Sequence, residues 1–344
     1  MPSFGITLPV RNRKAFTTAI LQQLTDQVAQ QVPTHSVQPA DIQIIVVDDG
    51  SHDGTPELIQ QRFPKVHLLR GDGNLWWTGA IAQAMTYAAS ELHTDYIIWL
   101  NDDITLADDF IAQVIQHCLS LNGQPNGQLN DQPNDQPNNK TLIGGIVCDQ
   151  QHPHWIVFGG VIAGQLINDI KQFEQPVLGV DTLNGNIAIL PTQIITDIGL
   201  PDVQRFRHYG GDFEYICRAK RNGYRVQLSK ALHATTEYRP TDVIRYMPLW
   251  IQWAISPRLV DKWRVLQNLS CRRSPHNVEH MVNSIHRAKP TVPKWKYLSF
   301  YCRKLVKIIG SEFIPWPIKQ RRIQAYFQRQ NIPDDIIQAV WNQP

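Results

Sequence analysis

The sequence predicts an α/β protein whose mostly parallel sheet is flanked by helices on both faces. Short apolar, β-branched runs alternate along the chain with longer stretches that have apolar residues at helical spacing. Three of these runs also end abruptly in polar loops, as strands do at the edge of a parallel sheet. Both observations favour a Rossmann-like arrangement of alternating strands and helices.

The elements follow one another regularly through the first half of the chain. Residues 6–10 and 43–47 have strand patterns. Between them, residues 14–32 place Ala19, Ile20, Leu24 and Val28 near helical spacing. The later predicted elements are a helix over 56–62 with Thr55 as N-cap and Pro56 at its first position, a strand over 66–69, a helix over 80–92, and strands over 96–100, 142–147 and 155–162.

The most informative of these strands ends in adjacent carboxylates. The run Tyr96–Leu100 leads through an asparagine into Asp102 and Asp103. A buried strand does not tolerate unpaired charges, so these acids are expected at the sheet edge, where α/β proteins bind ligands. Their hard oxygens suit Mg²⁺ or Mn²⁺. A polar strand end followed by a helix N-cap is the alternative, because Asp108 and Asp109 come next.

Two further loops have the same character. The run over 43–47 ends in Asp48 and Asp49 and then a turn, and the run over 6–10 ends in Arg-Asn-Arg. A glycine-rich loop with adjacent tryptophans, residues 71–80, then leads into a helix. Glycines let a backbone approach a phosphate closely, and the tryptophans either stack on a base or sugar or cover the core.

Together these motifs resemble the family 2 glycosyltransferases with the GT-A fold. The resemblance rests on "LPVRNR", "VVDDGSHDGT" and "LNDD", the last standing where the family has an Asp-x-Asp metal motif, and it covers roughly residues 4 to 235. Such enzymes transfer a sugar from a nucleotide diphosphate sugar. The double tryptophan departs from the commoner Ala-Arg-Asn form and is similar to a subset, including rhamnosyl- and galactofuranosyl-type transferases, that acts on surface polysaccharides.

The resemblance implies a donor site and a metal site. Asp49 matches the acid that binds the nucleotide base, and Asp103 matches the ligand of a divalent metal, Mn²⁺ or Mg²⁺, on the diphosphate. His233 matches a histidine that completes the metal site in related proteins, although a single histidine is usually structural. The other donor-binding residues implied are Pro9, Val10, Arg11, Gly73, Asn74, Trp77 and Asp102.

A second acidic motif, in residues 209–219, is expected to carry catalysis. Asp212 precedes a helical pattern, so its structural role would be an N-cap worth about 1 kcal/mol. The resemblance makes it the general base that takes the proton of an acceptor hydroxyl. Glu214 either orients the acceptor or pairs with Arg218 one turn along the helix.

Two more residues are predicted on the acceptor side. Asn184, in a segment that resembles the family's acceptor-side strand, and Trp76 are expected to bind acceptor hydroxyls and sugar faces together with Glu214. Asn184 and Asn186 are equally well explained as turn-forming residues.

Composition fits a soluble enzyme. The 344 residues are 42% hydrophobic, which suffices for one sizeable core with an appendage, and no run of about 18 apolar residues predicts a transmembrane helix. The N-terminus enters a strand pattern almost at once, so no leader peptide is expected. Five scattered cysteines indicate reduced thiols in a cytoplasm. No nucleic-acid partner is expected.

The charge divides the chain into two predicted parts. Residues 1–238 form the catalytic domain, with 15 basic and 24 acidic side chains, and include a low-complexity, flexible insertion at 122–140. Residues 239–344 form a mainly helical region with 18 basic and 6 acidic side chains and six tryptophans. Its helix over 294–309 either meets a membrane surface at the inner face of the cell membrane, contacts a partner such as a second copy, or packs on the catalytic domain.

The sequence therefore predicts an inverting glycosyltransferase. It would move a sugar from a nucleotide diphosphate sugar to a hydroxyl of a saccharide or lipid-linked saccharide, in surface polysaccharide biosynthesis. The alternatives are a nucleotidyltransferase, whose Gly-rich, Arg/Lys-bearing N-terminal signature is absent from "LPVRNRKAF", and a non-catalytic nucleotide-sugar-binding protein, which would not need Asp212.

Overall fold

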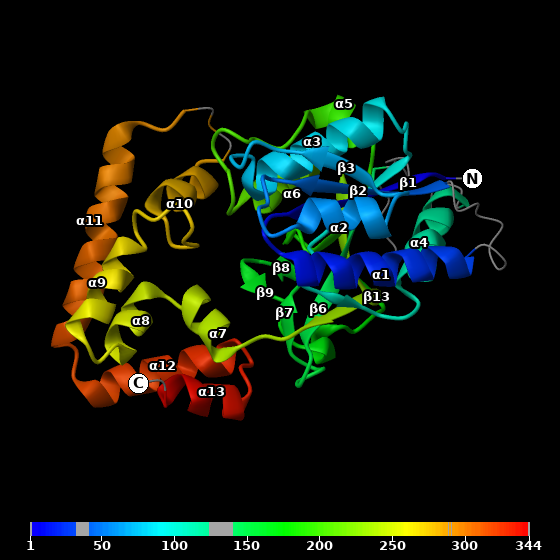
Figure 1. Ribbon diagram of the computed structural model, residues 1–344. Coiled ribbons are helices and arrows are strands. Elements are labelled where there is room, and N and C mark those ends of the chain that lie inside the picture. The colour runs from blue at the N-terminus through cyan, green and yellow to red at the C-terminus, as the bar shows by residue number, and fades with distance from the viewer. Residues whose placement is uncertain (1, 32–40, 124–139, 288, 290, 343–344) are drawn as a thin grey trace. The chain divides into compact units, whose positions relative to one another are not determined.

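The protein consists of two compact units in a computed structural model (Figure 1). The structure describes residues 2–31, 41–123, 140–287, 289 and 291–342; residues 124–139 of the predicted insertion lie outside this set. The first unit comprises residues 1–203 and 211–236, and the second comprises 204–210 and 237–344. The chain passes from the first unit into the second for the last time after Thr236, two residues before the predicted domain boundary at 238.

The first unit is built on a large twisted sheet. Its described strands follow the order β10-β13-β6-β12-β4-β1-β2-β3, and six of these eight run in one direction, with β10 and β12 opposed. The prediction of a mostly parallel sheet is confirmed. The strands are β1 (Phe4–Val10), β2 (Ile42–Asp48), β3 (His67–Arg70), β4 (Tyr96–Leu100), β6 (Thr141–Asp149), β10 (Val177–Gly179), β12 (Ile187–Pro191) and β13 (Arg225–Thr236).

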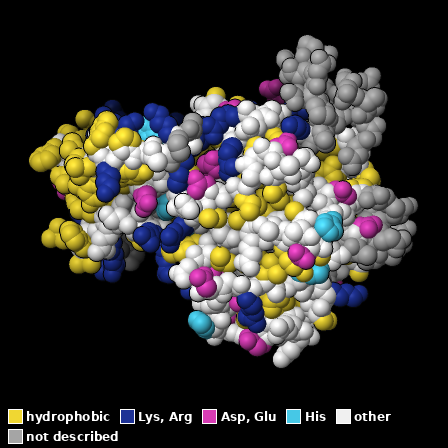
Figure 2. All heavy atoms as spheres, turned by 90° about the horizontal axis from the view of Figure 1, so that it is seen from above, with side chains coloured by type: hydrophobic (Ala, Val, Ile, Leu, Met, Phe, Trp, Pro, Cys, Tyr) yellow, Lys and Arg dark blue, Asp and Glu magenta, His cyan; other side chains and the backbone are white. Residues whose placement is uncertain are grey.

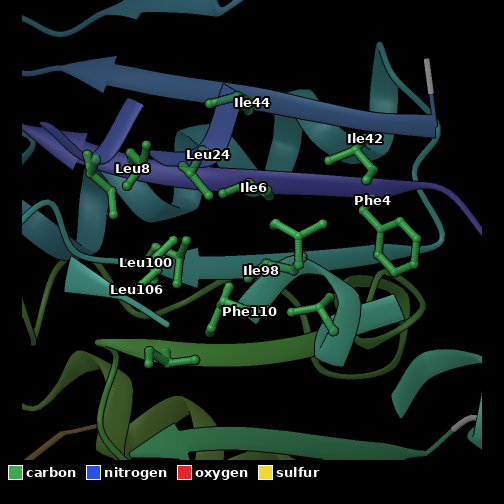
Figure 3. Close-up of a cluster of buried hydrophobic side chains, with 14 of the residues drawn as sticks. Phe4, Ile6, Leu8, Leu24, Ile42, Ile44, Ile98, Leu100, Leu106 and Phe110 are labelled. Carbon is green, nitrogen blue, oxygen red and sulfur yellow. The ribbon is translucent and has the colours of Figure 1, made fainter. Parts of the chain in front are cut away.

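Hydrophobic clusters cover both faces of this sheet, because its central strands are apolar on both sides. In β1 and β2, Ile6, Leu8 and Val46 contribute to one cluster (Figure 3), whereas Ile45 and Val47 point into the other. The helices α1 (Lys14–Gln31), α2 (Thr55–Arg62) and α4 (Phe110–Gly123) pack on the first face, and α3 (Trp76–Ser90), α5 (Ile194–Ile198) and α6 (Gly211–Arg221) on the second.

Two shorter described strands pair with strands of the main sheet. β5 (Thr105–Leu106) pairs with β13, and β7 (Ile156–Phe158) pairs with β6. A separate three-stranded sheet has the order β11-β8-β9, formed by Thr182–Leu183, Gly160–Ile162 and Gln165–Leu166. The 3-10 turn η2 (Ile170–Gln172) lies between β9 and β11 in the chain. The strand predicted over 155–162 is therefore wrong as one element, because its two halves pair in different sheets.

Two predicted helix starts also differ from the structure. Gly54, with φ of 82°, precedes α2 in the place predicted for Thr55, whose hydroxyl instead donates to Asp53. α3 begins at Trp76 and not at residue 80, because the carboxylate of Asp49 accepts the N–H groups of Leu75 and Trp76 and so replaces a local cap.

The second unit is helical, as predicted for the C-terminal region. One cluster joins Leu249, Val265, Leu269, Val282 and Ile308. Nothing in the described helices combines the length and hydropathy needed to cross a bilayer. The helices are α7 (Pro240–Tyr246), α8 (Leu249–Ile255), α9 (Leu259–Gln267), α10 (Val278–Ile285), α11 (Lys294–Gly310), η3 (Ser311–Phe313), α12 (Trp316–Arg329) and α13 (Asp334–Trp341).

Candidate active site

The predicted site residues gather at one edge of the main sheet. The parallel strands β1, β2 and β4 end there, and β12 begins there because Ile187 pairs with Leu100 in antiparallel register. The loops that follow or precede these strands supply the polar groups. This is the edge at which α/β sheets bind ligands.

Asp49 organises the glycine-rich loop. The residue is 3% exposed, and its carboxylate accepts N–H groups from Gly73 at 2.8 Å, Leu75 at 3.1 Å and Trp76 at 2.9 Å. Arg11 donates to the carbonyl of Gly73, so the loop after β1 is joined to the same turn. Gly73 has a φ of 87°, a conformation that glycine adopts without strain. The predicted role of Asp49 in base binding stays a prediction, since backbone groups already engage both of its oxygens.

Asp48 is the neighbouring acid that the sequence interpretation passed over. It is 1% exposed, and its Oδ2 lies 3.2 Å from Nη1 of Arg70. Its Oδ1 is buried without a hydrogen-bond partner in the part of the chain that the structure describes. Of the two adjacent acids, Asp48 therefore keeps an unused acceptor atom at the end of β2.

The carboxylates after β4 bind an arginine from the first loop. Nε of Arg13 lies 2.8 Å from Oδ1 of Asp102, and its Nη2 lies 3.0 Å from Oδ2 of Asp103. Burial raises the pKa of Asp102 to about 7, while Arg13 and the hydroxyl of Thr17 act in the opposite direction. Asp102 is enclosed, whereas the side chain of Asp103 is 44% exposed. Of the two, Asp103 is the carboxylate that a ligand can reach.

Asn101 connects this strand end to the acceptor-side turn. Its Oδ1 accepts the indole N–H of Trp77 at 2.9 Å, and its amide donates to Oδ1 of Asn186 at 2.5 Å. Asn186 in turn donates its backbone N–H to Oδ1 of Asn184 at 3.1 Å. The turn before β12 is thus fixed by asparagines, which supports the turn-forming interpretation and leaves the predicted acceptor role of Asn184 untested.

Asp212 lies in the first turn of α6 and contacts the same turn. Its Oδ2 accepts the N–H of Gly185 at 2.9 Å, and its Oδ1 accepts the N–H of Phe213 at 2.8 Å. A Cβ on Gly185 would stand 2.3 Å from the Trp77 ring, so only glycine permits this approach. Burial raises the pKa of Asp212 to about 6, and the backbone N–H donors oppose this shift. Such a carboxylate is ionised at neutral pH and basic enough to accept a proton.

Glu214 points elsewhere. It is 5% exposed, and its two oxygens receive Nε and Nη2 of Arg218 at 3.0 and 3.1 Å. Arg218 also donates to the carbonyls of Ile198 and Leu200. Of the two interpretations of Glu214, the geometry supports the ion pair with Arg218 along the helix. The role of Glu214 in acceptor binding stays a prediction.

His233 contacts the segment that follows Asp103. Its backbone carbonyl accepts the N–H of Ala107, and the acid that acts on its pKa is Asp109; burial, the larger effect, lowers that pKa. Thr236 of β13 contacts Asp103 directly, because its hydroxyl donates to the Asp103 carbonyl at 2.9 Å. Nε2 of His233 is buried with no partner within the described residues. Its role as a metal ligand stays a prediction.

The donor set fits a metal held partly by substrate. Among the residues that the structure describes, no three His, Cys, Asp or Glu side chains are grouped to hold an ion. Mg²⁺ and similar ions, however, are commonly bound through one or two carboxylates plus substrate phosphates. Asp103 is a reachable carboxylate of this kind, and Arg13 would share it or move aside.

The comparisons with known proteins agree with this geometry. Residues 6–122 match the family model of glycosyl transferase family 2. Over these residues the chain carries a family 2 glycosyltransferase domain. The matched segment contains β1, β2, β4 and the carboxylates that follow them. No curated protein matches the sequence significantly.

Solved structures show that the fold is the GT-A fold of glycosyltransferases. S. aureus TarS is 13% identical with a TM-score of 0.50, and the match covers 98% of this chain and 55% of TarS, so this chain spans about half of TarS. The mannosyltransferase PcManGT from Pyrobaculum calidifontis, solved in complex with GDP-Man and Mn²⁺, is 12% identical with a TM-score of 0.50; the match covers 98% of this chain and 83% of that one.

Three residues of this glycosyltransferase domain were missed from the sequence. Arg13 binds both carboxylates after β4, Asn101 joins Trp77 to the turn before β12, and Asp48 keeps a buried acceptor atom. Arg13 and Asp48 lie inside the motifs "LPVRNR" and "VVDDGSHDGT", so the sequence contained a signal that could have identified them as site residues. The contacts of Asn101 depend on residues far along the chain, and nothing local predicts them.

Proposed function

We propose that this protein is an inverting glycosyltransferase that moves a sugar from a nucleotide diphosphate sugar to a hydroxyl of a saccharide acceptor. The observation that carries the proposal is the placement of Asp212. Its carboxylate, with a pKa raised to about 6 by burial, is joined through Gly185, Asn186 and Asn101 to the strand end that bears Asp103. A proton acceptor and a candidate metal ligand thus border one sheet edge.

The reaction is a single displacement. The acceptor oxygen forms a bond to the anomeric carbon from the side opposite the nucleoside diphosphate, and its proton passes to the carboxylate of Asp212. The bond between the anomeric carbon and the diphosphate breaks, and its electron pair leaves with the nucleoside diphosphate. Attack from the opposite side inverts the configuration at the anomeric carbon.

The donor would lie over the loops that follow β1, β2 and β3. Arg11 and the N–H-rich turn around Gly73 border this place, and Asp103 would hold Mn²⁺ or Mg²⁺. A metal held there by Asp103 would neutralise charge on the leaving diphosphate. The GDP-Man and Mn²⁺ bound to PcManGT support a nucleotide diphosphate sugar and a divalent ion here. The proposed donor contacts are Pro9, Val10, Arg11, Asp49, Gly73, Asn74, Trp77 and Asp102.

The acceptor would be a growing surface polysaccharide, free or lipid-linked. Trp76 and Asn184 are proposed to contact it beside Asp212, on the side of the turn before β12. Glu214 is the weakest of the proposed acceptor contacts, because Arg218 holds both of its oxygens. We place the enzyme in the cytoplasm, where nucleotide sugars are available, at the inner face of the membrane.

A panel of nucleotide sugars tests the proposal. One donor should raise the melting temperature with Mn²⁺ and much less in EDTA, and should then be consumed when a saccharide acceptor is added. NMR of the product should show the opposite anomeric configuration to that of the donor. Retained configuration would contradict the inverting mechanism. Pyrophosphate release from a nucleoside triphosphate and a sugar phosphate would identify a nucleotidyltransferase instead.

A further inference from the structure

The second unit exposes an unusual number of large apolar side chains. Leu259 and Phe313 are each 85% exposed and Val306 is 72% exposed, values that leave these side chains almost wholly in solvent. Scattered exposed apolar residues are normal, but a contiguous set marks an interaction site. The remaining members of the set are Val260, Trp263, Trp295, Leu298, Ile309, Trp316 and Ile318.

Helix α11 shows that these side chains are not simply its packing face. Tyr297, Phe300, Tyr301, Leu305 and Ile308 pack against the cluster of the second unit. The exposed residues Trp295, Leu298, Val306 and Ile309 recur at helical spacing on a different side of the helix. Packing within the unit therefore explains one face of α11 and leaves a second apolar stripe without a partner in the described structure.

Contacts within the unit bring α9 together with η3, which directly follows α11. Lys262 of α9 lies 2.9 Å from Oε1 of Glu312, and the indole of Trp253 donates to the other oxygen at 2.8 Å. These bonds hold the first turns of α9 near Phe313. In Figure 2, hydrophobic side chains are gathered at the left of the view, with Lys and Arg side chains among them.

The charge of the region specifies the chemistry of its partner. Residues 239–344 carry 18 basic and 6 acidic side chains, a balance of +12. Two copies meeting through such a surface would repel, whereas an anionic lipid surface attracts it. Arg258, Arg264, Arg303 and Lys307 are exposed close in sequence to the apolar residues.

A cavity in the same unit also combines basic and apolar side chains. Its volume is about 360 Å³, and its lining includes three cations, from α11 and α12, and no carboxylate. Lys307 and Ile314 place the cavity at the C-terminal end of α11, the end at which Val306, Ile309 and Phe313 are exposed. The lining residues are Trp250, Lys307, Ser311, Ile314, Arg322, Ala325 and Arg329. Cations in an apolar recess suit a phosphate attached to a hydrophobic molecule.

We propose that the second unit docks on an anionic bilayer. The exposed apolar side chains of α9, α11 and η3 enter the interface, and Lys307, Arg322 and Arg329 bind the phosphate of a lipid headgroup. The proposal does not depend on the transferase reaction, because docking needs neither donor nor acceptor.

Co-sedimentation of the full-length protein with vesicles tests it. Binding should occur with phosphatidylcholine vesicles that contain phosphatidylglycerol, be absent with phosphatidylcholine alone, and weaken as salt shortens the screening length from about 10 Å at 0.1 M to about 3 Å at 1 M. Equal binding to both vesicles, or no binding to either, would overturn the proposal.

Two variants assign the surface. Lys307→Gln/Arg322→Gln/Arg329→Gln should weaken binding to the anionic vesicles about 100-fold, since each basic residue at an anionic surface contributes about 5-fold. Val306→Ser/Phe313→Ser should reduce binding without changing its salt dependence. All five side chains altered in these variants are exposed, so circular dichroism and the melting temperature should stay unchanged.

A matched control separates the surface from net charge. Lys65→Gln/Lys171→Gln/Lys230→Gln removes three exposed lysines from the first unit and should bind vesicles as the wild type does. Equal losses in both triple variants would show that only total charge matters. Concentration-dependent dimerisation that Val306→Ser/Phe313→Ser abolishes would instead make this surface a contact between copies.

Discussion

At the scale of single residues, two buried carboxylates of the site differ in what surrounds them. Burial raises the pKa of both Asp102 and Asp212, to about 7 and about 6. Asp102 faces the guanidinium of Arg13 at 2.8 Å, so it is committed to an ion pair. The partners of Asp212 are the backbone N–H groups of Gly185 and Phe213, which leave its basicity available to a hydroxyl.

Asp212→Asn should abolish most of the transfer while donor binding persists. Asparagine keeps the size of the side chain but does not accept a proton, and general-base catalysis contributes about 10²–10⁴-fold. We expect kcat to fall by that factor with the donor affinity, measured by calorimetry, within about twofold of the wild type. An equal loss in donor affinity would make Asp212 a donor-site residue.

The pH dependence of kcat gives a second, independent readout of Asp212. The base works only when it is deprotonated, and its pKa is raised to about 6, so kcat should fall on acidification through that value and stay level above it. The residual activity of Asp212→Asn should lack this acidic limb. An unchanged limb in the variant would assign the titration to another group.

Asp103→Ala should remove the metal dependence of donor binding. The carboxylate is exposed at a strand end, so its loss should leave the melting temperature of the free protein nearly unchanged. Calorimetry with and without Mn²⁺ should show the same weak affinity for the donor in the variant. The same titration of His233→Ala tests the second predicted ligand: a loss of Mn²⁺-dependent binding would support His233 as a metal ligand, and retained binding would contradict that role.

At the scale of elements, the sequence predicted those helices and strands whose positions depend on the local pattern of apolar residues. The strands β1, β2 and β4 are short, β-branched and buried on both faces, so their positions could be read directly from apolar runs. The start of α3 could not, because its cap is Asp49, which is 27 residues away from Trp76. Likewise, the hydroxyl of Thr236 donates to the Asp103 carbonyl, and neither this contact nor the register shift in β13 between Leu228 and His233 has a local signal.

Helix α6 illustrates how an element positions a catalytic group. Arg218 bonds to Glu214 in the preceding turn and to the carbonyls of Ile198 and Leu200, and this fixes the helix that begins with Asp212. Glu214 is 5% exposed, and among the described residues Arg218 alone forms an ion pair with its buried carboxylate.

Arg218→Leu should therefore destabilise the protein strongly. Breaking a buried pair on one side costs about 3–5 kcal/mol, which corresponds to about 10 °C in melting temperature for a unit of this size. The double variant Glu214→Leu/Arg218→Leu should recover much of that loss, because no charge remains unpaired. If Glu214→Gln instead raised the KM for the acceptor and left the melting temperature unchanged, Glu214 would be an acceptor-binding residue.

At the scale of the whole molecule, the chain separates opposite charges into different units. Residues 1–238 carry a balance of −9 and residues 239–344 one of +12. The carboxylates proposed for metal binding and catalysis, Asp103 and Asp212, belong to the first unit, whereas the second unit holds the exposed apolar residues and the basic side chains that lie near them in sequence. The net charge of +3 therefore describes neither unit, and each is expected to bind its own ligand.

Hydrogen exchange on the full-length protein should detect these two binding events separately. The donor with Mn²⁺, at about 100 times its dissociation constant, stabilises the bound state by about 2.7 kcal/mol, so amides that exchange by opening of the site should slow by up to about 100-fold. This slowing should fall on residues 71–76 and 184–186, whose N–H groups bind Asp49, Asp212 and Asn184, and not on α11 or α12. Anionic vesicles should slow α9, α11 and η3 and leave residues 71–76 unchanged. Lys307→Gln/Arg322→Gln/Arg329→Gln should lose the second effect and keep the first. Protection of α11 by the donor alone would contradict the separation and show that the two units respond to the donor together.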